Sequence, residues 1–121
     1  MAKDYRISVL LGFYGDVLTE KQRDMIEFYY DDDLSLAEIA QNEGITRQGV
    51  RDNIKRGEAV LLDLEERLGL AKRFEDMKKD LDSIRRAAYE IEELNNRFGG
   101  PREIRERTQL IAALSERLCE E

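Results

Sequence analysis

The stretch formed by residues 34–56, LSLAEIAQNEGITRQGVRDNIKR, constrains the fold of this chain more than any other. Ser35, followed three residues later by Glu38, forms a capping-box pattern, and this predicts a short helix from Leu36 to Glu43. Gly44 then stands where a tight turn needs left-handed backbone, a conformation cheap only for glycine. Thr46 is placed to cap a further helix with its hydroxyl. A helix, a glycine turn and a second helix in this order predict a helix-turn-helix.

The second helix of this motif contains the candidate DNA-contacting residues, because a helix-turn-helix lays that helix in the major groove. The candidates are Thr46, Arg47, Gln48, Arg51, Asp52, Lys55 and Arg56. An arginine can pair bidentately with guanine, a glutamine with adenine, and an aspartate can accept from cytosine. Gly49 is expected on the exposed face, where a side chain would otherwise reach the groove. The alternative is that these residues form only the solvated face of a core helix, with Arg51 and Lys55 paired to neighbouring acids.

The charge of the chain opposes this DNA-binding hypothesis. The formal net charge is -7, and residues 1–70 hold nine Lys and Arg against fifteen Asp and Glu. The half with the motif is therefore the more acidic one. Because affinity for DNA comes largely from neutralised phosphates, only a local basic face could overcome a uniform acidic field.

Two helices are predicted before the motif. Val9, Leu10, Phe13 and Val17 fall at helical spacing and predict a first helix over about residues 5–14. Thr19 is an N-cap for the second helix, with Gln22 completing a capping box. Met25, Ile26 and Tyr29 are expected to face the core. Asp31, Asp32 and Asp33 end that helix in a loop, either a solvated turn or a cation site.

The second helix of the motif continues far beyond it. Its apolar seam, spaced by alternating steps of four and three, is Val50, Ile54, Gly57, Leu61, Leu64 and Leu68. Gly69 is expected to end the helix, and Leu70 is placed to complete a Schellman-type stop against Leu64. Residues 1–69 are therefore predicted to form a helix-turn-helix domain.

Residues 70–121 are predicted to form a helical hairpin. A new seam with heptad-like spacing begins directly, and its members are Leu70, Phe74, Met77, Leu81, Ile84, Ala88 and Ile91. Gly99, Gly100 and Pro101 break the chain before a last helix over about residues 102–118. Two helices alone bury little, so the hairpin is expected to mediate dimerisation or partner binding, most simply as a homodimer. The pattern leaves open whether the seam closes within one chain or between two.

The composition excludes several classes of function. No apolar run approaches the roughly 20 residues that a membrane span needs, and no signal peptide is evident, so a cytoplasmic protein is expected. The chain has no histidine and one cysteine, Cys119, which leaves no ligand set for zinc and no activated nucleophile. No phosphate-binding glycine loop follows a strand pattern. We therefore expect no enzyme activity, no cofactor and no metal.

The motifs resemble known proteins. The segment from Leu18 to Leu68, with S-L-A-E-I-A followed by G-I-T-R-Q-G-V-R, resembles region 4 of bacterial sigma factors, a four-helix domain. Nearly the whole chain, including L-L-G-F-Y-G-D-V-L-T at residues 10–19, is similar to the YlxM-like family of small bacterial proteins. The resemblance implies a helix-turn-helix protein that binds double-stranded DNA and a link to the signal recognition particle pathway. In sigma region 4 the start of the second motif helix contacts bases, which here corresponds to Arg47, Gln48, Arg51 and Asp52, with Lys55 near the backbone.

Two functions follow from the sequence. The first is a dimeric DNA-binding regulator that uses the motif. The alternative is an adaptor of the signal recognition particle pathway that keeps the fold without binding DNA. For the adaptor, the candidate anchors are Tyr29, Tyr30, Phe74 and Met77.

Overall fold

The computed structural model describes residues 1–120, and it confirms the all-α fold class. The described residues form a first unit, Met1–Ala71, and a second unit that begins at Lys72. The helices are α1 (Arg6–Tyr14), α2 (Glu20–Tyr30), α3 (Leu36–Glu43), α4 (Arg47–Leu68), α5 (Leu70–Arg97) and α6 (Arg102–Glu120), with a 3-10 turn η1 (Gly15–Val17) after α1.

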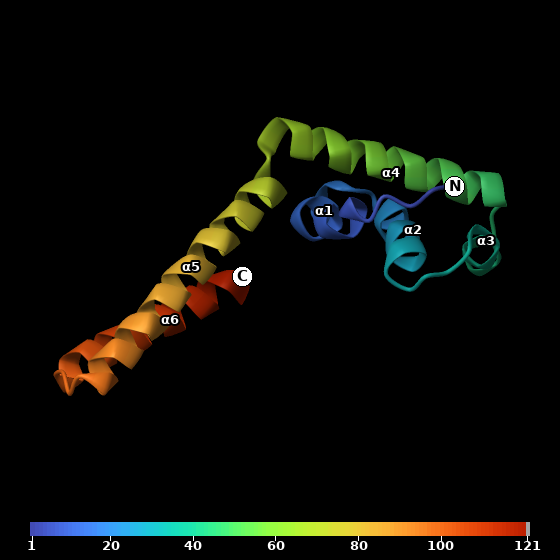
Figure 1. Cartoon of the computed structure of the whole chain (residues 1–121). Helices are drawn as coiled ribbons and strands as arrows, with labels where there is room; N and C mark the ends of the chain where they lie inside the picture. The colour runs from blue at the N-terminus through green and yellow to red at the C-terminus, as the bar shows by residue number, and fades with distance from the viewer. Residues whose placement is uncertain (121) are drawn as a thin grey trace. The chain divides into compact units, whose positions relative to one another are not determined.

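In the first unit, α1, α2 and α3 all pack against the long helix α4 (Figure 1). The predicted seam of α4 supplies the centre of this core, since Val50, Ile54 and Leu61 are fully buried. The other helices, together with Leu18 between η1 and α2, contribute the rest of the buried apolar set: Ile7, Leu10, Leu11, Tyr14, Leu18, Met25, Ile26, Tyr29, Tyr30, Ile39 and Ala40. Burial of this many large side chains is what stabilises a small domain.

The buried face of α1 differs from the residues whose spacing predicted the helix. Of Val9, Leu10, Phe13 and Val17, only Leu10 lies in the core, and the other three are exposed. The core face is instead Ile7, Leu10, Leu11 and Tyr14, spaced three, one and three residues apart. Both sets fit a helical period, and contact with α2 and α4 decides between them.

Helix α2 begins and packs as its sequence predicts. The Thr19 hydroxyl accepts from the Gln22 amide and the Gln22 side chain accepts from the Thr19 amide, which forms the capping box. At Gly57, α2 and α4 approach so closely that an added Cβ would lie 2.5 Å from Cδ1 of Ile26. The glycine in the α4 seam therefore permits the close contact between these two helices.

Two carboxylates at the end of α2 and in the loop after it bond to residues near the N-terminus of the chain. Asp33 has φ 55° and accepts from Lys3 Nζ at 2.7 Å, and Lys3 holds the pKa of this carboxyl below its usual value. Asp31 accepts from the Ser8 hydroxyl at 3.3 Å. Among residues 1–120, no group of three or more potential ligand side chains is placed to hold a metal ion.

The junction between α4 and α5 is a single residue, Gly69, with φ 63°. The Schellman-type stop predicted here is wrong: the Gly69 amide bonds to the Glu65 carbonyl, but the Leu70 amide donates to the Tyr14 hydroxyl at 3.1 Å. Tyr14 in turn donates to Glu65 Oε1 at 2.7 Å, and that oxygen accepts from the Ala71 amide. Burial and the Glu65 carboxylate raise the pKa of Tyr14, so the hydroxyl stays a donor. Tyr14 of α1 and Glu65 of α4 thus accept from the first two amides of α5.

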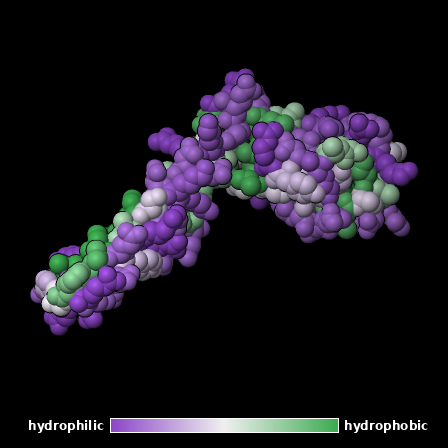
Figure 2. All heavy atoms as spheres, viewed as in Figure 1, coloured by the Kyte–Doolittle hydropathy of each residue, from purple (hydrophilic) through white to green (hydrophobic). Residues whose placement is uncertain are grey.

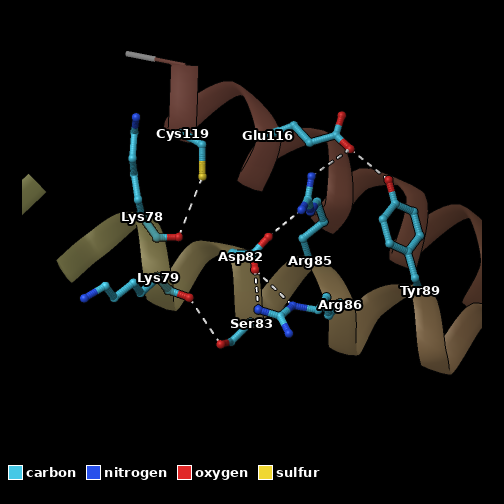
Figure 3. A network of polar contacts seen from close by, with 9 residues as sticks. All are labelled: Lys78, Lys79, Asp82, Ser83, Arg85, Arg86, Tyr89, Glu116 and Cys119. Carbon is cyan, nitrogen blue, oxygen red and sulfur yellow. Dashed lines mark hydrogen bonds and ion pairs between the residues drawn. The ribbon is translucent and has the colours of Figure 1, made fainter. Parts of the chain in front are cut away.

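The second unit is an antiparallel hairpin in which α6 returns along α5 (Figure 1). Polar contacts join the two helices on one side (Figure 3). Glu116 on α6 accepts from the Tyr89 hydroxyl at 2.8 Å and lies 4.0 Å from the Arg85 guanidinium. The Cys119 thiol lies 4.0 Å from the Lys78 carbonyl oxygen. These contacts fix which turn of α6 lies beside which turn of α5.

Between residues 72 and 120 the hairpin buries only small side chains. Its buried residues are Ala88, Thr108, Ala112 and Ser115. Phe74 and Leu81 of the predicted seam are partly buried, but three other large apolar side chains stay about half exposed, with Met77 at 49%, Ile84 at 47% and Ile91 at 48%. Within this unit the seam is therefore only partly covered.

The exposed apolar residues lie on the side opposite the polar contacts. At about 100° per residue, Ile84 and Ile91 lie to one side of Ala88, whereas Arg85 and Glu92 lie to the other. Glu92 accepts from Gln109 of α6 on that polar side. We call the other side the apolar flank; its members are Met77, Ile84, Ile91, Ile104, Ile111, Leu114 and Leu118. Figure 2 shows apolar residues gathered along one edge of the hairpin.

Candidate nucleic-acid interface

The fold holds the start of α4 in the geometry that the motif predicts. Ser35 and Glu38 form the capping box of α3, and Gly44 ends that helix with φ 69°. The Thr46 hydroxyl accepts from the Gly49 amide at 2.9 Å and so caps α4. Ile39 of α3 and Val50 and Ile54 of α4 are fully buried between the helices. Packing and capping thus orient the solvent-facing side of α4.

All seven candidate DNA-contacting residues are exposed at the start of α4. Arg47, Arg51 and Lys55 follow one another at intervals of four residues, which places them along one helix face. Among the residues that the structure describes, no ion pair engages Arg47, Arg51, Lys55 or Arg56. The pairing of Arg51 and Lys55 with neighbouring acids, considered as an alternative, is therefore not observed.

Gln48 and Asp52 interact with each other. The Gln48 side-chain amide donates to Asp52 Oδ1 at 2.9 Å, one helical turn along. This contact engages the carboxylate nearest to the basic residues. The same contact holds the Gln48 amide on the exposed surface. The amide would have to leave Asp52 before it could bond to a base edge.

Gly49 does not face the solvent as the sequence predicted. A Cβ at this position would lie 3.2 Å from the Thr46 hydroxyl oxygen and 3.5 Å from Cδ1 of Ile45. Gly49 therefore faces the cap and the turn of the motif, because the capping contact draws its backbone under Thr46. The absence of a side chain here removes nothing from the exposed face.

The acidic charge of the first unit is concentrated elsewhere. A stripe of carboxylates follows the outer side of α2 at steps of four, three and four residues, and we call it the α2 acidic stripe: Glu20, Asp24, Glu27 and Asp31. Arg23 interrupts it and pairs with Glu27 and with Asp16 of η1. The net negative charge of the unit thus does not rest on the start of α4.

The candidate anchors of the adaptor function fall into two groups. Tyr29 and Tyr30 are buried, each 7% exposed, so they are core residues and their assignment as surface anchors is wrong. The Tyr30 hydroxyl donates to the buried Glu58 carboxylate at 2.7 Å, and burial raises the pKa of this tyrosine. In the second unit, Phe74 is partly buried and Met77 is half exposed.

One exposed surface was missed by reasoning from the sequence. Tyr5, Val9, Phe13 and Val17 form an apolar row on the outer side of α1 and η1. Periodicity could have found it, because Ile7, Leu10, Leu11 and Tyr14 already account for a full buried face of the same helix.

Fold and motif define the class: an all-α helix-turn-helix protein. The family model described as "Putative helix-turn-helix protein, YlxM / p13 like" matches residues 1–99. Among similar relatives, a UPF0122 protein of Limosilactobacillus reuteri is 48% identical over 88 residues, which are 73% of this chain and 78% of the relative. One from Acetivibrio thermocellus is 43% identical over 100 residues, covering 77% of this chain and 86% of the relative. The chain belongs to this UPF0122 family of YlxM/p13-like proteins.

The match to the family model ends before α6, so the last helix lies outside the matched residues. Within the described part of the chain, none of the helices has the length and apolar character needed to cross a membrane.

Proposed function

We propose that this protein is a cytoplasmic, dimeric regulator that binds double-stranded DNA through the start of α4. The observation that carries the proposal is a set of four exposed basic side chains that form no ion pair with any of residues 1–120: Arg47, Arg51, Lys55 and Arg56. An ion pair would have to be broken before such a side chain could neutralise a phosphate, and here that cost is absent. Thr46, Gln48 and Asp52 complete the proposed contact surface.

The distribution of charge supports this proposal despite the net charge of -7. On the described face of α4, only Asp52 lies among the four basic residues, and it already accepts from Gln48. The α2 acidic stripe belongs to a different helix. A local basic face within an acidic protein would orient the molecule on DNA, since the acidic surfaces are repelled by the phosphates.

A gel-shift experiment with mixed-sequence duplex DNA at low salt tests the proposal. Arg47→Ala combined with Arg51→Ala should weaken binding by about tenfold or more, because phosphate contacts dominate the affinity. Arg67→Ala is the matched control, because Arg67 is also exposed on α4 but pairs with Asp63 at 3.0 Å. Binding that survives the double substitution, or that falls equally with Arg67→Ala, would count against the proposal.

The dimeric part of the proposal rests on the apolar flank of the hairpin. Residues from both α5 and α6 lie on it at 39–49% exposure, while the described part of the hairpin buries no large side chain. An apolar surface of this size is typical of an interface with another protein. Two such flanks placed face to face would form a four-helix bundle with an apolar core. A dimer would carry two α4 helices. Two recognition helices can enter successive major grooves on one face of DNA when they are about 34 Å apart.

The alternative function is an adaptor of the signal recognition particle pathway. Family resemblance points to that pathway, and the acidic surface of the first unit favours a basic partner. A pull-down with purified particle protein and RNA separates the two functions. Retention that is unaffected by Arg47→Ala with Arg51→Ala, together with no gel shift, would favour the adaptor.

A further inference from the structure

The exposed face of each hairpin helix carries one charged residue among apolar ones. On α6 the exposed residues at alternating steps of three and four are Ile104, Arg107, Ile111, Leu114 and Leu118. On α5 the exposed residues with the same spacing are Met77, Asp80, Ile84, Ala87, Ile91, Leu94 and Phe98. This spacing keeps each set on one face of its helix, as in a coiled-coil seam. Asp80 and Arg107 therefore lie within the apolar flank, at positions where such a seam normally has an apolar side chain.

Asp80 and Arg107 lie far apart along the hairpin of one chain. Gln109 of α6 donates to Glu92 of α5 at 3.2 Å, and the two helices are antiparallel. Arg107, two positions before Gln109, therefore lies near the level of residue 94. At a rise of 1.5 Å per residue, the roughly 14 positions between this level and Asp80 correspond to about 20 Å. Among residues 1–120, neither charged side chain forms an ion pair.

These two charges distinguish between the two ways in which a pair of hairpins can pack flank to flank. A charge inside an apolar interface is costly unless an opposite charge lies beside it. With the 99–101 loops of both copies at the same end, Asp80 of one copy and Arg107 of the other remain about 20 Å apart in level, so each charge faces apolar residues. With the loops at opposite ends, a two-fold axis midway between the two levels brings each Asp80 to the level of Arg107 of the second copy.

The same axis also gives the largest overlap of the apolar flank with its copy. The flank runs from Met77 on α5 to Ile104 on α6, and Ile104 lies five positions before Gln109, near the level of residue 97. The middle of this span coincides with the middle between the levels of Asp80 and Arg107. Pairing of the charges and burial of the apolar side chains thus favour one and the same arrangement.

Starting from the proposed dimer, we propose that its two hairpins pack with their loops at opposite ends, and that Asp80 of each copy pairs with Arg107 of the other. A single charged position in an apolar seam selects register and orientation, at some cost in stability relative to an apolar residue. The two pairs also select a second copy of this chain over other apolar partners, which would leave both charges unpaired.

Reversal of the two charges in the full chain tests this pairing, with analytical ultracentrifugation as the readout. Asp80→Arg alone places like charges together at both pairs, and so does Arg107→Asp alone. Each should raise the dissociation constant of the dimer at least about tenfold, because the like charges lie in an apolar interface. An equimolar mixture of the two variants should return to within about threefold of the wild type, since the mixed dimer has opposite charges at both pairs.

The matched control is Glu75→Arg, which makes the same change of charge on an exposed residue of α5 that lies about 140° around the helix from Asp80. It should leave the dissociation constant unchanged, and circular dichroism verifies that each variant is folded. Single variants that dimerise like the wild type or no worse than Glu75→Arg, or a mixture as weak as its components, would overturn the pairing alone. A wild-type chain that is monomeric at every concentration would overturn the pairing together with the proposed dimer.

Discussion

The two units of this protein are both helical, but they bury different kinds of side chain. The first unit encloses large apolar residues such as Ile26, Ile54 and Leu61 at 0% exposure. The second buries alanine, serine and threonine, while its large apolar residues lie half exposed on one flank. The comparison teaches that helical periodicity alone does not make a core, because a core also needs a second layer to cover the apolar face. The first unit supplies that layer from α1, α2 and α3, and we propose that a second copy of the chain supplies it for the second unit.

The largest effect should come from the core of the first unit. Leu61→Ala removes a fully buried side chain from the centre of α4, and should lower the free energy of unfolding by about 2–5 kcal/mol. Val17→Ala is the control, since Val17 is 64% exposed and should cost far less. Urea denaturation at one fixed protein concentration measures both. Similar losses of stability for the two variants would contradict the assignment of Leu61 to the core and of Val17 to the surface.

The next largest effect is expected in the second unit, on dimerisation rather than on the stability of a core. Ile84→Asp combined with Leu114→Asp places charges on the apolar flank, and should raise the dissociation constant of the proposed dimer at least about tenfold, since a buried unpaired charge is costly. Analytical ultracentrifugation over a range of concentrations measures it. Ala113→Asp is the control, because Ala113 is exposed on the polar side of α6, within one turn of Gln109 and Glu116, and it should leave the dimer intact. A wild-type chain that stays monomeric at all concentrations would contradict the proposed assembly.

A smaller effect is expected at the junction between α4 and α5. Tyr14→Phe removes the hydroxyl that accepts from the Leu70 amide and donates to Glu65, which should cost about 1–3 kcal/mol locally. Hydrogen exchange of the Leu70 and Ala71 amides should become faster, while that of the Val50 and Ile54 amides stays slow. Unchanged exchange at Leu70 would show that the tyrosine does not cap α5.

The smallest effect concerns the start of the candidate DNA-binding helix. Thr46→Ala removes the cap that accepts from the Gly49 amide, and should cost about 0.5–2 kcal/mol of stability. Thermal unfolding measures this loss. Thr46→Ser keeps the hydroxyl and should restore most of the stability. A serine variant as unstable as the alanine variant would assign the loss to the methyl group instead.

Elements with both a local start signal and a local stop signal could be predicted from the sequence. Helix α3 begins after the Ser35 cap and ends at Gly44 as predicted, because capping and left-handed glycine are properties of a few adjacent residues. The seam of α4 was also correct from Val50 to Leu61.

The predictions that failed concern features that depend on contacts between residues far apart in the sequence. Gly69 ends α4 as predicted, but the Leu70 amide bonds to Tyr14, 56 positions away, so no local motif could reveal how the start of α5 is capped. On α1, two sets of apolar residues fit the helical period, and only packing against α2 and α4 selects the buried one. At the candidate site, the exposure of Arg47 and Arg51 followed from the pattern of the motif. The Gln48–Asp52 contact and the inward position of Gly49 depend on side-chain and backbone geometry that spacing does not specify.

The central claim is that the basic start of α4 neutralises DNA phosphates, and the salt dependence of DNA affinity tests it most directly. A plot of log affinity against log salt should fall for the wild-type chain, with a slope of about -0.9 for each phosphate neutralised. Arg51→Ala should make this slope shallower by about 0.9 if the side chain neutralises one phosphate, or by about 1.8 in a dimer where both copies do so. A flat slope for the wild-type chain, or an identical slope for the variant, would contradict the claim.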